Sequence, residues 1–349
     1  MQLREQLITA RPEAKAYAES LHSLPNCISE IKGRIGAITI YPIKSLGGLH
    51  LQDGASVRDI GLVTEDGNYA DRSAVIALRK PGVTEGQPYE YVRFTQREEG
   101  KLSLPTPRYD GKKRLTYSAE GMPDLTLIPE DLNPSWSKKR VHVKLSSEIQ
   151  DGVCEKGNIT AWIRTFLKKV TECPRYDIDD IEVLITPVTF KRDVENKHSR
   201  SQDVQTLYSD GGQVLVTSSS TLSWMNGYLR KQYGKSFRTI SMEAFRPNIV
   251  LDELPPNVED VIGRISFQGK EHIRMLFGGM SVRCDVTRVD PRTGNKPDKE
   301  PLRWLKAHRP PRLDAPHSTT FGVNTVFPVM ESAKVIRPGE CFIIEEEKS

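Results

Sequence analysis

One cysteine beside an arginine is the first candidate for chemistry in this sequence of 349 residues. Cys284 follows Arg283 in the segment MSVRCDVTRVDPRTG. A neighbouring cation favours the thiolate, which is both a nucleophile and a soft metal ligand. A cysteine at a strand position is also common as a small core residue. On its own, the pair leaves both interpretations open.

Three further segments place cations where the chain turns. Arg246 and Asn248 in AFRPNIVLD stand at the entry to a strand, where a guanidinium can bind a phosphate or carboxylate through two hydrogen bonds. An ordinary surface arginine with a turn asparagine is the alternative. Lys44 and Ser45 in YPIKSLGG resemble an anion-binding corner, without the residue order of a Walker A loop. Arg72 follows an aspartate before the apolar run AVIAL, and such an adjacent pair is more often structural.

These segments lie on or beside predicted strands. In the first half, short apolar-alternating runs are separated by Gly, Pro and Asp-Gly turns, and this density of short strands favours a closed or nearly closed sheet. Helices are predicted at 158–170, with lysines at the C-terminal end, and over SSTLSWMNGYLRKQYG, which Gly234 closes. The remainder returns to strands, among them SVRCDVTRVD and ECFIIEEE.

Two segments stand outside this pattern. The residues before 34 contain good helix formers and predict a surface helix that packs on the body of the protein. The polar stretch after Phe190 predicts a long exposed connection or an active-site loop.

Composition limits the classes of function. At roughly 150 residues per domain the length suggests about two domains. The net charge of +4 is too small to argue for nucleic acid, but it would suit an anionic cofactor if it were concentrated in one cleft. Five scattered cysteines without a CxxC pair argue against a disulfide scaffold or a closed zinc site and favour a reducing compartment. We find no transmembrane run, no secretory signal and no clear mitochondrial presequence, and we expect a cytoplasmic protein, with mitochondrial association as the alternative.

The order of the motifs is more specific than any one of them. YPIKS, DR, TQR at 95–97, YSD, FRPNIV, RCDVTRVDPRTG and FG follow one another between residues 34 and 344. This series resembles the MOSC proteins, in particular the two-part proteins of the amidoxime-reducing kind. The resemblance implies an α+β, β-rich fold, with a MOSC N-terminal β-barrel domain at 34–180 and a MOSC β-barrel domain with peripheral helices at 185–346. Residues 1–33 would form a helical extension.

The resemblance also implies a cofactor and the residues that hold it. The family binds the molybdenum cofactor, Mo-molybdopterin, between its two halves, and a thiolate suits a metal that already carries dithiolene sulfurs. By resemblance Cys284 is the molybdenum ligand and the catalytic residue. The implied cofactor-binding residues are Lys44, Ser45, Arg72, Thr217, Ser218, Arg246, Asn248 and Arg283. Many relatives have the pattern CxRC, and Ser281 replaces its first cysteine here, which excludes a role for a second thiol.

The implied reaction is the reduction of an N-hydroxylated compound, in which an N–O bond is replaced by N–H and water is released. The sequence shows no haem-attachment, iron–sulfur or GxGxxG motif, so we expect electrons from a separate protein. A cytochrome b5-type protein with its flavin (NADH) reductase is one donor, and a ferredoxin-like protein is the other. We expect a monomer.

Two alternatives remain open. The first is a non-catalytic carrier of the molybdenum cofactor. The second is a MOSC enzyme recruited to a special biosynthetic pathway, in which the loop after Phe190 and the histidines His198, His308 and His317 shape a substrate pocket.

Overall fold

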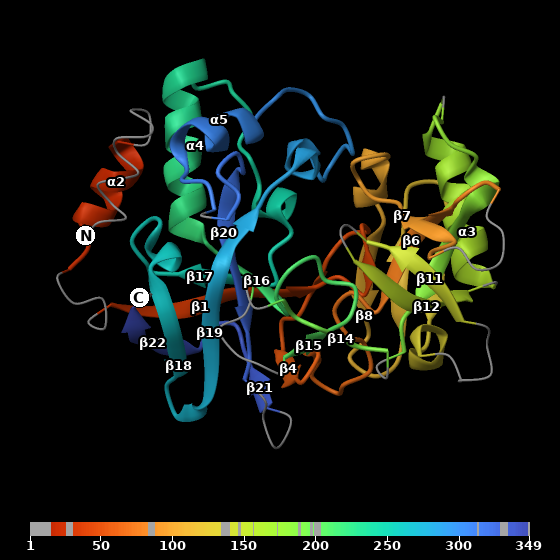
Figure 1. The fold of residues 1–349 in the computed structure, drawn as a ribbon, viewed down its shortest axis with the longest axis horizontal. Coiled ribbons are helices and arrows are strands. Elements are labelled where there is room, and N and C mark those ends of the chain that lie inside the picture. Colours follow the sequence, from red (N-terminus) through yellow and green to blue (C-terminus); the bar gives the residue numbers. More distant parts are fainter. Residues whose placement is uncertain are drawn as a thin grey trace.

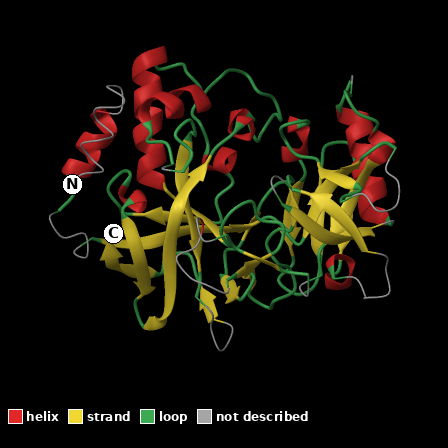
Figure 2. Cartoon of the chain, in the orientation of Figure 1, coloured by secondary structure: helices red, strands yellow, loops and turns green. Residues whose placement is uncertain are grey.

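The structure is a computed structural model, and it describes residues 15–25, 31–82, 88–133, 140–145, 148–155, 157–172, 174–187, 190–195, 198, 204–312, 314–328 and 334–347. Two β-barrels lie side by side, and the longer helices stand at the periphery (Figure 1). Strands predominate in both halves, and loops fill the region between them (Figure 2). These features confirm the predicted β-rich α+β architecture with closed sheets.

Seven strands form the larger barrel. Their order around the ring is β17 (Ile249–Asp252), β16 (Val214–Ser218), β20 (Thr320–Val326), β19 (Lys270–Val282), β18 (Ile262–Phe267), β22 (Cys341–Glu347) and β1 (Lys32–Ile40). The ring closes because β1 pairs antiparallel with both β22 and β17, with Ile38 opposite Ile249. β3 (Leu49–His50) extends the sheet beside β1. Closure leaves no unpaired edge along most of the ring.

The smaller barrel is built from the first half of the chain. It contains β6 (Ala74–Arg79), β7 (Tyr91–Arg93), β11 (Arg140–Lys144), β12 (Ile149–Glu155) and β13 (Ile181–Ile185). Pairing of β13 with β6 closes it, and β2 (Ile43–Lys44) joins β6 in parallel. The helix α3 (Asn158–Val170) packs its apolar face against this barrel, with Ile163 and Leu167 fully buried. Its bounds are those predicted from the sequence.

Shorter elements connect and cover the barrels. Three small sheets are formed by β4 (Ala55–Arg58), β5 (Gly61–Thr64) and β21 (Lys334–Ile336), by β8 (Thr106–Tyr109), β9 (Leu115–Ser118) and β10 (Leu125–Leu127), and by β14 (Arg192–Asp193) and β15 (Gln205–Thr206). The other α-helices described are α2 (Lys15–His22), α4 (Ser219–Tyr233) and α5 (Leu302–His308). The 3-10 helices are η3 (Gly100–Ser103), η4 (Pro129–Leu132), η5 (Ile178–Asp180), η7 (Met242–Phe245), η8 (Val258–Asp260) and η9 (Asp285–Arg288).

The N-terminal helix packs on the body of the protein, as predicted, beside α5. Tyr17 and Leu21 of α2 are buried, and the Tyr17 hydroxyl donates a hydrogen bond of 3.0 Å to a carboxylate oxygen of Asp260. The first fourteen residues of the predicted helical extension lie outside the described part of the chain. Among the residues that the structure describes, no helix is both long enough and apolar enough to cross a membrane.

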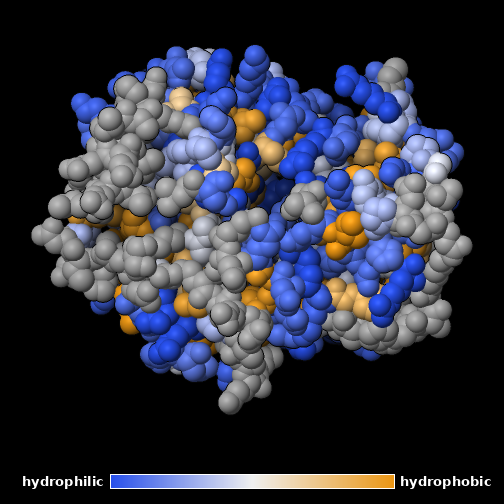
Figure 3. All heavy atoms as spheres, in the orientation of Figure 1, coloured by the Kyte–Doolittle hydropathy of each residue, from blue (hydrophilic) through white to orange (hydrophobic). Residues whose placement is uncertain are grey.

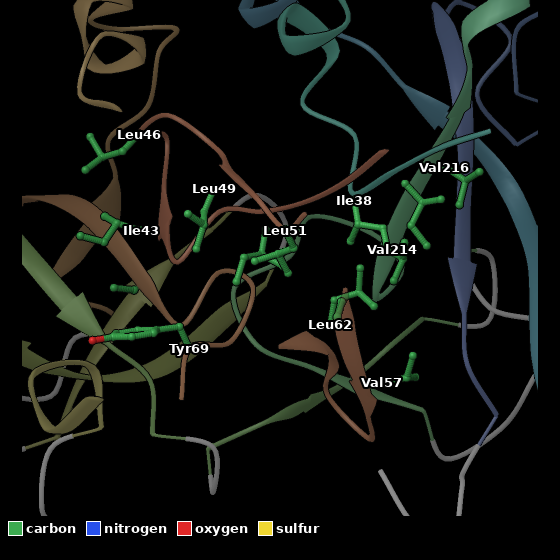
Figure 4. Packing of buried hydrophobic residues seen from close by; sticks show 14 of the residues in the cluster. Ile38, Ile43, Leu46, Leu49, Leu51, Val57, Leu62, Tyr69, Val214 and Val216 are labelled. Atoms are coloured by element: carbon green, nitrogen blue, oxygen red, sulfur yellow. The ribbon is translucent and has the colours of Figure 1, made fainter. Parts of the chain in front are cut away.

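One hydrophobic core runs through both barrels. In its central part, Leu49 and Leu51 lie between Ile43 on the side of the smaller barrel and Val214 of the larger one (Figure 4). Burying a leucine side chain stabilises a fold by roughly 1.5–3 kcal/mol. A shared core of this kind fixes the two barrels relative to each other and therefore also the residues between them.

One predicted strand is wrong. β19 ends at Val282, and the residues after Cys284 form the 3-10 helix η9 instead of continuing the strand SVRCDVTRVD. The cause is local, because one carboxylate oxygen of Asp285 accepts a hydrogen bond of 2.6 Å from Arg288, three residues further on, and the other accepts one of 2.7 Å from Lys296. Cys284 consequently lies at a corner and is only partly buried.

Candidate cofactor site between the barrels

A cavity of about 450 Å³ is lined by residues from both barrels. On the face drawn in Figure 3 the surface is hollowed between the two halves, and hydrophilic residues surround the hollow. Seven of the nine predicted site residues line the cavity, namely Lys44, Ser45, Arg72, Arg246, Asn248, Arg283 and Cys284. The first three belong to the segments around the smaller barrel and the last four to the larger barrel, so segments far apart in the sequence form one site.

The cavity concentrates positive charge. Its cationic lining residues are Lys44, Arg72, Arg93, Arg97, Arg246, Arg283 and Arg312, whereas Glu195 and Asp210 are its acidic ones. The modest positive charge of the whole chain is thus focused in one cleft. A cleft lined mainly by one sign of charge attracts ligands of the opposite sign, which favours an anionic ligand.

Three of the lining residues adopt a backbone conformation that side chains other than glycine rarely adopt. Ser45, Arg72 and Arg246 have φ angles of 83°, 54° and 54°. Such left-handed residues cost roughly 1–3 kcal/mol each and cluster at functional sites. Ser45 directly follows β2 and Arg246 directly follows η7, whereas Arg72 stands in the turn before β6 and donates its backbone N–H to the Tyr41 carbonyl at 2.9 Å. All three strained residues thus stand at turns that border the cavity.

Arg246 has a donor without a partner. Its guanidinium stacks on the Tyr41 ring at 4.2 Å from the centroid, and its Nη1 donates to the Leu46 carbonyl at 2.8 Å. Its Nη2 is buried and has no hydrogen-bond partner within the described residues. Burial lowers the pKa of Arg246 to about 10. A buried donor of this kind is costly unless something accepts its hydrogen bond, and an anion in the cavity would do so.

Arg283 repeats this arrangement beside the cysteine. Its Nη2 donates to the Phe245 carbonyl at 2.6 Å and its Nη1 to the Ser281 hydroxyl at 3.1 Å. Its Nε is buried without a partner in the part of the chain that the structure describes, and burial lowers its pKa. Ser281, at the position of the first cysteine of the CxRC pattern, therefore helps to orient Arg283.

Lys44 and Asp210 form a pair on the other wall. Nζ of Lys44 donates to the Tyr208 carbonyl at 2.7 Å and to Asp210 at 2.8 Å. Burial lowers the pKa of Lys44 to about 8, although the nearby carboxylate opposes the shift. Burial tends to raise the pKa of Asp210. The positive charges of Lys44 and Arg93 outweigh this effect and hold the pKa well below its usual range. The neighbouring hydroxyl of Ser45 lies 3.5 Å from the Phe94 carbonyl.

Asn248 connects the two halves of the site. Its side-chain nitrogen donates to the Thr39 carbonyl at 3.0 Å. Its side-chain oxygen accepts hydrogen bonds of 3.0 Å from the Leu215 backbone and from Nη1 of Arg72, which also pairs with the neighbouring aspartate. The amide is almost fully buried. Its hydrogen bonds are used inside the protein, so Asn248 holds Arg72 in place and supports the wall of the cavity.

Replacing Asn248 with alanine is expected to lower the free energy of unfolding by about 2–4 kcal/mol, because several buried groups would lose their partners. Urea denaturation of the cofactor-free protein measures this change. Asn133, which is exposed, supplies the matched control, and its replacement with alanine should stay within about 0.5 kcal/mol of the wild type. Equal effects of the two substitutions would contradict the assignment.

Thr217 and Ser218 lie elsewhere. Neither lines the cavity, although both are buried. The Thr217 hydroxyl donates to the sulfur of Met242 at 3.2 Å, and the Ser218 hydroxyl is 2.6 Å from that of Ser220 at the start of α4. Leu215 of β16 lines the cavity, whereas Thr217 and Ser218 lie further along the strand, where it leads into α4. The structure thus does not bring these two predicted contacts into the site.

Sequence reasoning also missed residues that line the cavity. Arg97 places its Nε 3.2 Å from Sγ of Cys284, and Arg93 and Asp210, which form an ion pair, also line the cavity. Arg97 belongs to the TQR motif and Asp210 to the YSD motif. The order of the motifs therefore pointed to both segments, although neither residue had been given a role in the site. Of the three histidines considered, His198 lines the cavity, while His308 stacks on a tryptophan and His317 is exposed.

Comparison with known families agrees with this architecture. The family described as MOSC N-terminal beta barrel domain matches residues 32–170, and the MOSC domain matches residues 203–342. The chain therefore belongs to the MOSC-domain proteins that carry the MOSC N-terminal β-barrel domain, as the resemblance implied. The boundaries predicted at 34–180 and 185–346 stay predictions.

Individual relatives are similar over most of the chain. Mitochondrial amidoxime-reducing component 1 of Homo sapiens is 29% identical over 313 residues, which cover 88% of this chain and 82% of that protein. Mitochondrial amidoxime reducing component 2 of Macaca fascicularis is 28% identical, with coverage of 79% and 72%. Component 1 of Mus musculus is 28% identical, with coverage of 88% and 81%.

Proposed function

We propose that this protein is a molybdenum cofactor-dependent oxidoreductase that reduces N-hydroxylated compounds. The observation that carries the proposal is the convergence, in one cationic cavity, of the Cys284 thiol with unpartnered donors of Arg246 and Arg283. The similarity to amidoxime-reducing components supports the same class of reaction.

The residues present fit the molybdenum cofactor. Arg246 and Lys44 with Ser45 would hold the phosphate, because they offer two cations and a hydroxyl at strained turns. Arg283 would stabilise negative charge near the metal, and Cys284 would supply a thiolate ligand. When bound, the cofactor supplies the two-electron chemistry of the reaction.

The remaining tasks fall to the protein. Cleavage of the N–O bond consumes two electrons and two protons and yields an N–H product and one water, so the cavity must admit a small substrate and a proton source. Asp210 is ionised because of Lys44 and Arg93, so it orients these two cations and is not the acid. For electrons we propose a cytochrome b5-type protein with its flavin (NADH) reductase, or a ferredoxin-like donor, acting on a monomer in the cytoplasm.

The decisive experiment uses the full-length protein produced in a host that makes the cofactor. Elemental analysis should find about one molybdenum per chain, and pterin fluorescence should accompany it. The protein should then reduce benzamidoxime with cytochrome b5, its reductase and NADH. Molybdenum without reduction by any competent donor would indicate the cofactor carrier. Absence of molybdenum would overturn both assignments.

A biosynthetic enzyme on the same scaffold remains the second candidate function. The position of His198 on the cavity wall favours it, because this residue comes from the polar stretch after Phe190. Molybdenum and pterin in full amount, reduction of a single N-hydroxylated metabolite and no turnover of benzamidoxime would support it.

The pKa of Lys44 predicts how anion binding depends on pH. Below about pH 8 the amine is charged and attracts an anion, and above this value the charge is lost. Sulfate, whose charge is constant in this range, should therefore bind the cofactor-free protein about tenfold or more weakly at pH 9.5 than at pH 7. Calorimetric titration measures the change. Lys44→Met should bind weakly at both pH values, and a decline of the same size in this variant would contradict the role of Lys44.

A further inference from the structure

The TQR motif forms a compact turn between β7 and η3 whose contacts the proposed function does not use. The backbone N–H and the hydroxyl of Thr95 both donate to one carboxylate oxygen of Glu98 at 2.8 Å. The backbone N–H of Arg97 donates to the Thr95 hydroxyl at 3.1 Å. These local bonds fix the conformation of the motif.

The middle residue ties this turn to the anion-binding corner. Nε2 of Gln96 donates to the Ser45 carbonyl at 2.6 Å, and the Gln96 side chain is buried. The turn therefore cannot move without moving the strained residue that lines the cavity beside Lys44.

The far side of the turn is docked on the larger barrel. Nζ of Lys296 donates to the Arg97 carbonyl at 2.9 Å, and Nζ of Lys101 donates to the Thr293 carbonyl at 2.9 Å. A Cβ on Gly100 would lie 2.2 Å from the Gly294 carbonyl oxygen, so the two backbones touch where only glycine fits. The position of Arg97 relative to the larger barrel is thus set on both sides.

From this position Arg97 reaches the cysteine sulfur. Its Nε–H donates to Sγ of Cys284 at 3.2 Å, across the interface between the barrels. The neighbouring carboxylate of Asp285 does not compete for the guanidinium, because Arg288 and Lys296 already occupy it. The contact therefore joins a cation of one barrel to the metal-binding thiol of the other.

We propose that Arg97 is a positioning residue that holds Cys284 and weakens the electron donation of its sulfur to bound molybdenum. A hydrogen bond to a ligand sulfur withdraws electron density, orients the ligand and raises the reduction potential of the metal. This inference rests on the proposed function, since it requires the metal to be bound at Cys284. It gives each residue of the motif a role, namely fixing the turn, anchoring it to Ser45 and donating to the sulfur.

The test compares three variants of the cofactor-loaded protein. Arg97→Met removes every side-chain donor, and Arg97→Lys keeps a cation whose ammonium group can still donate to the sulfur. Arg93→Met is the matched control, because it removes a cation from the same cavity without touching the sulfur. The readouts are the midpoint potential and the sulfur-to-metal charge-transfer band in circular dichroism, identified as the band lost in Cys284→Ser. Molybdenum and pterin contents are measured for every sample.

Arg97→Met should shift the band to lower energy and the potential to a more negative value, and Arg97→Lys should shift both less. Arg93→Met should leave the band in place. Loss of molybdenum from the Arg97 variants alone would also support the inference. A wild-type band in Arg97→Met, or an equal shift in Arg93→Met, would overturn it. Wild-type protein without molybdenum would instead overturn the proposed function, so the two failures are distinguishable.

Discussion

Replacing Cys284 with alanine is expected to abolish the reduction of N-hydroxylated substrates while the pterin stays in its cavity. The substitution removes only the sulfur, and Arg246 and Lys44, which we propose to hold the phosphate, remain in the cavity. Loss of a residue that merely supports a metal ligand costs about 10- to 100-fold in activity or metal affinity, so loss of the ligand itself should exceed about 100-fold. Steady-state kcat/KM, molybdenum content and pterin content measure the three parts of this prediction.

Two other cysteines serve as controls. Cys154 and Cys341 lie outside the cavity, so alanine at either position should leave the molybdenum content and kcat/KM near the wild-type values. If Cys284→Ala kept both molybdenum and activity, the thiol would not be the ligand. If it lost the pterin as well, the thiol would contribute to cofactor binding as a whole, which contradicts the division of roles described above.

Replacing Arg246 with methionine is expected to weaken cofactor binding without lowering the stability of the cofactor-free protein. Each charge-assisted hydrogen bond lost to the phosphate weakens binding by roughly 10- to 100-fold. The cofactor-free protein, however, should be no less stable, because the substitution removes a cation whose pKa burial already lowers. Thermal unfolding of cofactor-free and loaded samples measures both effects, since a ligand raises the Tm in proportion to its affinity.

The matched control is an arginine at the surface. Arg114 is exposed and lies outside the cavity, so Arg114→Met should keep the full increase in Tm on loading. A large fall in the Tm of cofactor-free Arg246→Met would show that Arg246 serves mainly to stabilise the fold. Nη2 of Arg246, which has no partner among the described residues, would then no longer support a role in ligand binding.

The site could be predicted from the sequence to the extent that each residue stands in a motif with its own local geometry. Lys44, Arg72 and Arg246 stand at chain turns that are visible in the sequence. The left-handed backbone angles of Arg72, Arg246 and Ser45, the residue after Lys44, explain why such turns recur beside functional groups. The helix over 158–170 was predicted to its last residue because its apolar spacing is local.

What depends on contacts between distant segments could not be predicted. The residues near Arg97 in the sequence do not indicate that it contacts Cys284, because this contact forms only when the two barrels pack together. The strand expected through Cys284 is wrong for a different, local reason, because Asp285 accepts hydrogen bonds from Arg288 and Lys296, which the apolar alternation of the segment does not reveal. Thr217 and Ser218 stand at a motif position that is plausible for a cofactor contact, yet they do not line the cavity. The motif alone does not show which residues at the end of a strand face the cavity.

The place of β1 in the larger barrel has a consequence for how the protein is made. This strand leaves the ribosome early, whereas its neighbours β17 and β22 come from the third and last quarters of the chain. Until they are synthesised, both edges of β1 are unpaired except where β3 pairs with Thr39 and Ile40, and such edges are sites for aggregation and for chaperone binding. The smaller barrel is complete long before that point and can fold while the larger one waits. The cationic cleft between the barrels is consequently complete only after β22 has closed the ring.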